Sequence, residues 1–153
     1  MGYLSILPVV LVGVLATAGL TFLLEVVGEQ WGFETPPPTH PVGDLLEDPS
    51  TAQIIGLFFL VSVFAPITEE IMFRGFLYNA IRIRWTWFWS GLLMGFIFAA
   101  IHPQGILGVP VLMALGLGFG MIREWRDTIV PSMTAHALHN GAAITAALLM
   151  MNL

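Results

Sequence analysis

The chain has 153 residues, of which 57% are hydrophobic and 10% are charged, and its mean hydropathy is +0.86. Soluble domains carry about a quarter charged residues, so this composition excludes a typical soluble globular protein. The five basic residues are all arginine and there is no cysteine, which excludes a disulfide scaffold, a Cys-ligated zinc site and a nucleic-acid binder with a basic surface. The formal net charge of -5 reflects acids gathered mostly between residues 25 and 48.

Long apolar runs predict an all-α protein, a polytopic transmembrane helical bundle with about five spans of about 20 residues each. In chain order, the runs are residues 3–24, residues 51–67 with helix-compatible sequence to 83, and residues 85–101, 105–122 and 130–153. We expect an N-terminal transmembrane helix over residues 1–27, an acidic Pro-rich extracytoplasmic loop over 28–50, and a single core domain over 51–153.

Arginines at the ends of the runs predict the orientation. Arg82 and Arg84 separate the second and third runs, and Arg123 and Arg126 separate the fourth and fifth, so both pairs fall on one side. By the positive-inside rule that side is cytoplasmic, which predicts a multi-pass protein of the cell inner membrane with a cytoplasmic N-terminus.

Glycines four residues apart occur in two neighbouring runs. They are Gly91 with Gly95 and Gly116 with Gly120. Small residues let helix backbones approach closely in lipid, so this spacing predicts tight packing of the third and fourth runs.

Two adjacent carboxylates, Glu69 and Glu70, lie in the second run close to Arg74. An ionisable side chain inside the membrane costs about 3 kcal/mol on insertion scales, so each needs a partner or a function. Glu70 and Arg74 are one helical turn apart and can form an ion pair, whereas Glu69 points about 100° away. Glu69 is therefore the carboxylate left for chemistry; the alternative is that both acids are structural partners of Arg74.

Histidines and an amide follow in later runs. Phe98 and His102 share a helical face at the end of the third run, where a histidine can also be merely interfacial. His136 and Asn140 share a face of the last run, with His139 beside them. A histidine and an amide aligned in this way can donate to an oxyanion, ligate a metal or bond to neighbouring helices.

Depth in the membrane allows these polar groups to meet. At about 1.5 Å per residue, Glu70 and His136 lie roughly 18 and 15 Å from the arginines at the cytoplasmic ends of their runs. His102 reaches a similar depth if the buried helix begins at Ser90. The sequence therefore predicts a short third span with a polar end inside the bilayer.

The three motifs, in this order, resemble the signature of the CAAX prenyl protease and bacteriocin-processing (CPBP, or Abi) intramembrane proteases. That signature is Glu-Glu-x-x-x-Arg, Phe-x-x-x-His and His-x-x-x-Asn, which stand here as Glu69-Glu70-Ile71-Met72-Phe73-Arg74, Phe98 to His102, and His136 to Asn140. The resemblance covers roughly residues 51–150 and implies a helical bundle that hydrolyses a peptide bond within the membrane.

The resemblance also implies a role for each motif. Glu69 would be the general base, and His102 would hold or activate the attacking water. His136 and Asn140 would stabilise the oxyanion, and the ion pair of the first motif would order the site.

The resemblance leaves the cofactor, substrate and partners open. A divalent metal such as zinc, held by Glu69, His102 and His136, is one alternative, and a metal-free glutamate mechanism is the other. The implied substrate is a membrane-bound peptide or protein, such as a prenylated CAAX-like one, with no nucleic acid involved. Larger members have additional spans, so a second copy or a partner subunit could complete the cavity here.

Two other functions are compatible with the same residues but do not require all of them. One is a non-proteolytic membrane scaffold or bacteriocin self-immunity protein of the same family, and the other is a proton or ion pathway. A scaffold has no obvious need for Glu69, His102, His136 and Asn140 together. The intact motifs therefore favour the protease.

Overall fold

The computed structural model describes residues 6–32, 49–103 and 105–150. These residues form helices, with no strand among them, which confirms the all-α fold class. Four of the helices are α1 (Ile6–Trp31), α6 (Trp87–Ala100), α7 (Gly105–Arg126) and α8 (Val130–Met150). Between α1 and α6, the segment Thr51–Arg82 is one continuous helix. Its successive parts are α3 (Thr51–Phe59), the π-helix η1 (Leu60–Phe64), α4 (Ala65–Glu70), the π-helix η2 (Ile71–Leu77) and α5 (Tyr78–Arg82).

Local sequence explains where two of these helices begin or end. Ser50 and Gln53 form a capping box at the start of α3, in which each side chain contacts the backbone N–H of the other residue. α1 continues to Trp31, beyond the expected start of the loop at residue 28, and is followed by Gly32 at a φ of 68°. This left-handed conformation suits glycine and commonly ends helices. The Pro-rich part of the expected loop, residues 33–48, lies outside the described residues.

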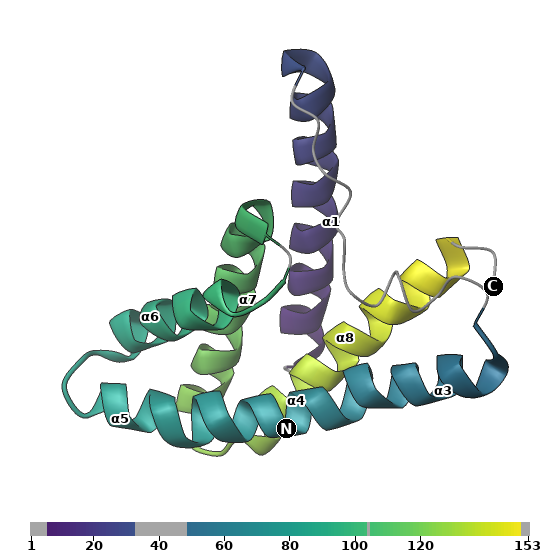
Figure 1. Cartoon of the computed structure of the whole chain (residues 1–153). Helices are drawn as coiled ribbons and strands as arrows, with labels where there is room; N and C mark the ends of the chain where they lie inside the picture. Colours follow the sequence, from purple (N-terminus) through teal and green to yellow (C-terminus); the bar gives the residue numbers. More distant parts are fainter. Residues whose placement is uncertain (1–5, 33–48, 104, 151–153) are drawn as a thin grey trace.

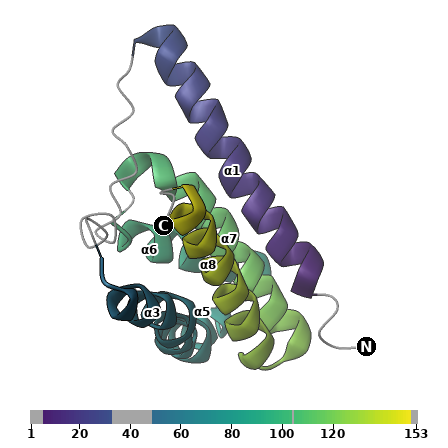
Figure 2. The same ribbon diagram turned by 90° about the vertical axis from the view of Figure 1, so that its right-hand side faces the viewer.

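The helices surround a centre formed by segments far apart in the chain. The helix Thr51–Arg82 runs along one side of the molecule and α8 lies against its η1 and α4 parts (Figure 1). α6 and α7 pack against each other more extensively than any other two elements, and α1 lies against α7 and α8 (Figures 1 and 2). This arrangement brings α4, α7, α8 and the end of α6 together.

Glycines on α6 and α7 make their close approach possible. A Cβ atom added at Gly95 would lie 2.5 Å from the carbonyl oxygen of Met113, and one added at Gly116 would lie 2.6 Å from the Cα of Gly95. These glycines therefore lie in backbone-to-backbone contact, as their spacing predicted. The contact also fixes the carbonyl of Gly116 beside the polar centre.

One described helix, Thr51–Arg82, is long and apolar enough to cross a membrane. Its large apolar side chains are widely exposed, including Ile55, Phe59, Met72 and Phe76. α6 has only 14 residues, in agreement with the expected short third span. Membrane crossing by the other helices, and the orientation of the bundle, stay predictions.

Candidate active site

Glu70 and Arg74 form a buried ion pair at the centre of the bundle. Both side chains are 0% exposed, and Arg74 Nη1 lies 2.8 Å from Glu70 Oε1. Arg74 Nη2 donates to the carbonyl oxygen of Gly116 on α7 at 3.0 Å, and His136 Nδ1 on α8 lies 3.0 Å from the same Glu70 Oε1. A carboxylate can only accept here, so His136 Nδ1 donates. The pair thus joins α4 and η2 to α7 and α8.

Aromatic rings enclose this ion pair. The guanidinium carbon of Arg74 lies 5.1 Å from the ring centroid of Phe98 and 5.3 Å from that of Phe119, within cation–π range. The Phe119 ring also stacks on the imidazole of His136, with centroids 4.7 Å apart and an interplanar angle of 23°. Phe119 therefore helps to orient His136. Phe119 was not among the residues expected at the site, although its position three residues after Gly116 places it on the same helical face.

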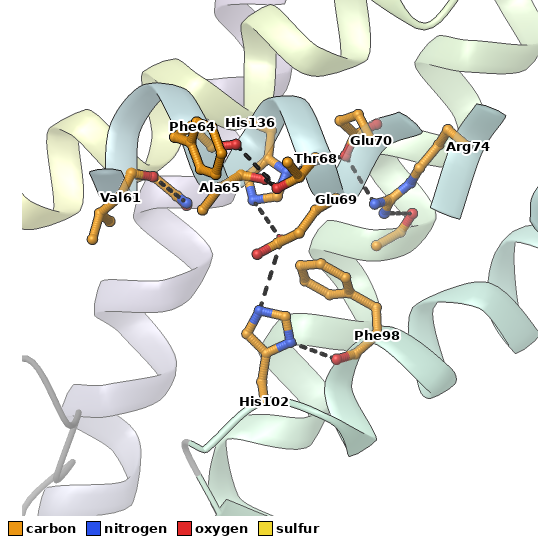
Figure 3. A network of polar contacts seen from close by, with 12 residues as sticks. Val61, Phe64, Ala65, Thr68, Glu69, Glu70, Arg74, Phe98, His102 and His136 are labelled. Atoms are coloured by element: carbon orange, nitrogen blue, oxygen red, sulfur yellow. Dashed lines mark hydrogen bonds and ion pairs between the residues drawn. The ribbon is translucent and has the colours of Figure 1, made fainter. Parts of the chain in front are cut away.

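Glu69 lies beside this buried cluster but does not join its hydrogen bonds. Its Oε2 atom lies 3.7 Å from His136 Nε2 and 4.0 Å from His102 Nε2 (Figure 3). Both distances exceed a hydrogen bond, and this buried oxygen has no hydrogen-bond partner among the described residues. The side chain of Glu69 is 26% exposed, whereas that of Glu70 is fully buried. The expected division between a paired Glu70 and a free Glu69 is thus what the geometry gives.

The ring orientations of both histidines are set by their Nδ1 atoms. His102 Nδ1 lies 2.6 Å from the carbonyl oxygen of Phe98, which can only accept, so this nitrogen carries the proton. His136 Nδ1 donates to Glu70 in the same way. When these rings are neutral, each Nε2 presents a lone pair towards Glu69. Glu69 Oε2 lies too far from either Nε2 atom for a direct hydrogen bond, and a water molecule that bridges Glu69 to one of the rings would fit this spacing.

The same three side chains were candidate metal ligands, and their spacing does not fit that role. Their chemistry is suitable, because metal-bound histidines also donate their second N–H to a carboxylate or carbonyl. Two ligands on one tetrahedral zinc lie about 3.3–3.5 Å apart, given Zn–N and Zn–O bonds of about 2.0–2.2 Å. The corresponding separations around Glu69 are 3.7 and 4.0 Å. In the described part of the chain, no group of three His, Asp or Glu side chains is arranged to hold a metal ion.

Asn140 and His139 lie on α8, which also carries His136. Asn140 Nδ2 donates to the carbonyl oxygen of Val61, at 3.1 Å, on the turn that precedes α4. His139 is buried on α8, and its Nδ1 has no hydrogen-bond partner within the described ranges. The expected pairing of His136 with Asn140 towards an oxyanion is therefore not the contact that Asn140 makes here.

A family profile matches the part of the chain that carries the three motifs. Residues 51–142 match the sequence profile of a family described as "Type II CAAX prenyl endopeptidase Rce1-like". An Escherichia coli protein named "Uncharacterized 24.3 kDa protein" is 29% identical over 123 residues, which cover 73% of this chain and 57% of that protein. The chain thus spans little more than half the length of this curated relative. No solved structure matches the chain.

Proposed function

Because the chain belongs to the type II CAAX prenyl endopeptidase Rce1-like family, we propose that it is an intramembrane endopeptidase that hydrolyses a peptide bond with a glutamate-activated water. The observation that carries the proposal is the unbonded Oε2 of Glu69, which faces the Nε2 atoms of His102 and His136 at 4.0 and 3.7 Å. A general base must be close to the water it deprotonates, and the two histidines beside Glu69 support a water bound there.

The proposed reaction begins with a water held between Glu69 and His102. Glu69 removes a proton from this water, and the resulting hydroxide attacks the carbonyl carbon of the substrate peptide bond. The tetrahedral oxyanion forms beside His136 Nε2, and a His136 that enters the reaction with both ring nitrogens protonated donates a hydrogen bond to it. Glu69 then returns its proton to the leaving amine as the C–N bond breaks. The products are a carboxylic acid and an amine, so the atoms balance.

Arg74 has a supporting role in this scheme. It forms an ion pair with Glu70, and Glu70 in turn fixes the orientation of the His136 ring. We therefore assign Glu70 and Arg74 to ordering the site and Glu69 to the chemistry. No step is assigned to a metal ion, because the spacing around Glu69 does not match a zinc ligand set.

The family is membrane-associated, and the helix Thr51–Arg82 that carries both glutamates is apolar and long enough to cross a bilayer. We propose a multi-pass arrangement in the cell inner membrane with a cytoplasmic N-terminus. The proposed substrate is the C-terminal part of a membrane-bound peptide or protein, such as a prenylated CAAX-like sequence.

The direct test is cleavage of membrane-tethered reporter peptides, with and without a prenyl group, by the purified chain in liposomes. We expect Glu69→Gln to abolish cleavage and Glu29→Gln, the same change at an exposed position on α1, to leave it intact. Full cleavage by the Glu69→Gln variant would overturn the proposal and favour the scaffold alternative. Loss of wild-type activity in a chelator, restored by added zinc, would overturn the metal-free mechanism alone.

A further inference from the structure

The helix Thr51–Arg82 buries a stripe of side chains that stand four residues apart. Ser62, Pro66, Glu70, Arg74 and Tyr78 are each 5% exposed or less. A straight α-helix turns about 100° per residue, so positions four apart drift by about 40° at each step and by about 160° in total. A straight helix would therefore turn Ser62 and Tyr78 towards nearly opposite sides, yet both are buried.

Two π-turns, one before and one after Glu69 and Glu70, offset this angular drift of the buried side chains. In η1 the N–H of Ala65 bonds to the carbonyl of Leu60, and in η2 the N–H of Tyr78 bonds to that of Phe73, five residues back in each case. A π-turn contains more residues per turn than an α-turn, so it slows the rotation of the side chains around the axis. Such turns are rare and occur often at functional sites. Here they set the directions in which Glu69 and Glu70 point.

The first π-turn leaves the backbone carbonyl of Val61 without a hydrogen-bond donor from its own turn of helix. The N–H of Ala65 is used by Leu60 instead of Val61, and Pro66, the next residue, has no N–H. The carbonyl of Val61 therefore lacks both of its usual donors. Asn140 on α8 supplies the missing hydrogen bond, at 3.1 Å. An unsatisfied carbonyl in apolar surroundings is costly, so this bond favours the π-turn over other local conformations.

The second π-turn has a similar contact at its other end. Asn79 Nδ2 donates to the carbonyl oxygen of Gly75, inside η2, at 2.6 Å. Asn79 Oδ1 accepts a hydrogen bond from Arg123 Nη2 on α7 at 3.1 Å. The amide of Asn79 thus ties the second π-turn to α7, as Asn140 ties the first to α8.

We propose that Asn140 and Asn79 are positioning residues that hold the two π-turns and thereby fix the directions of Glu69 and Glu70. The proposal rests on the proposed function, because it concerns the same site. It assigns one of the two N–H groups of the Asn140 amide to the carbonyl of Val61. Both asparagines bond to backbone carbonyls of the helix that carries Glu69, so the proposed effect passes through the backbone.

A double-mutant cycle between Asn140 and Pro66 tests the first contact without any need for activity. Asn140→Leu should lower the melting temperature of the detergent-purified chain. In a Pro66→Ala background that loss should shrink by at least half, because a helix without proline can return to the α pattern, in which the N–H of residue 65 bonds to the carbonyl of Val61. An equal loss in both backgrounds would overturn the role of Asn140. Because unfolding is measured here, an inactive wild-type chain would contradict the proposed function and leave this result intact.

Kinetic measurements on Pro66→Ala distinguish an effect on the direction of Glu69 from an effect on the stability of the fold. Pro66→Ala should keep the melting temperature of the wild-type chain but lower kcat about tenfold or more with KM unchanged, because a straightened helix turns Glu69 away from its water. Thr145→Val, which removes only a local hydrogen bond on α8, is the matched control and should change neither quantity. Wild-type kcat in the Pro66→Ala variant would show that the π-turn does not direct Glu69.

The second contact is tested by Asn79→Asp. This change keeps an oxygen for Arg123 but removes the donor to the carbonyl of Gly75, so the link to α7 persists. We expect kcat to fall several-fold at unchanged KM and unchanged melting temperature. Wild-type kcat in this variant would overturn the role of Asn79.

Discussion

Two ion pairs on the helix Thr51–Arg82 have different surroundings. Glu70–Arg74 is 0% exposed on both sides, and His136 and the carbonyl of Gly116 provide it with further hydrogen bonds. At the predicted cytoplasmic end, Arg82 pairs with Glu124 on α7 at 2.7 Å, but these side chains are 39% and 33% exposed. A buried charge needs every available partner, whereas a charge at the surface shares its stabilisation with solvent. The comparison indicates that the central pair orders the site. The outer pair instead holds the end of the helix Thr51–Arg82 against α7.

The largest effect is expected from breaking the central pair. Arg74→Met would leave Glu70 charged and buried without its cation, so the free energy of unfolding should fall by about 3–5 kcal/mol. Thermal unfolding in detergent would measure the loss, with Arg84→Gln at an exposed arginine as the control. A variant as stable as the wild type would show that the central pair is not what organises the bundle.

A smaller effect is expected from separating α6 and α7. Gly116→Ala places a Cβ 2.6 Å from the Cα of Gly95 and must displace the carbonyl that binds Arg74. Such overpacking costs about 1–3 kcal/mol, and cleavage should fall with it because Arg74 loses a partner. Gly56→Ala is the matched control, since nothing lies within 4 Å of its added Cβ. Equal unfolding temperatures for the two variants would contradict the close contact.

The smallest effect is expected at the outer pair. Arg82→Gln should change the melting temperature and the cleavage rate little, because solvent and salt screen this partly exposed contact. Unfolding and cleavage measured at low and high salt would check this expectation. A loss as large as that of Arg74→Met would remove the distinction between the two pairs.

Much of the fold could be predicted because it follows from local patterns. Apolar runs and glycine spacing predicted the helices and the contact between α6 and α7, and the short α6 follows from the depth argument. The pairing of Glu70 with Arg74 follows from helical spacing. The family assignment made from the three motifs is confirmed by the match over residues 51–142.

The features that could not be predicted depend on contacts between distant segments. A π-turn differs from an α-turn by one residue, and here its formation is coupled to Pro66 and to Asn140 on another helix. The bond from Asn140 to Val61 could not be predicted, because spacing on one helix says nothing about the facing backbone. Phe119 was missed for a related reason, since an aromatic residue in an apolar run carries no signal of the arginine and histidine it touches.

The most direct test of the account compares the same isosteric change at two adjacent acids. Cleavage of a membrane-tethered reporter and thermal unfolding would be measured for Glu69→Gln and Glu70→Gln. We expect Glu69→Gln to melt like the wild type and not to cleave, because Oε2 of Glu69 has no hydrogen-bond partner among the described residues and this acid is the proposed general base. Glu70→Gln should melt at a lower temperature, because Arg74 loses its carboxylate. A Glu69→Gln variant that cleaves at the wild-type rate would contradict the central claim.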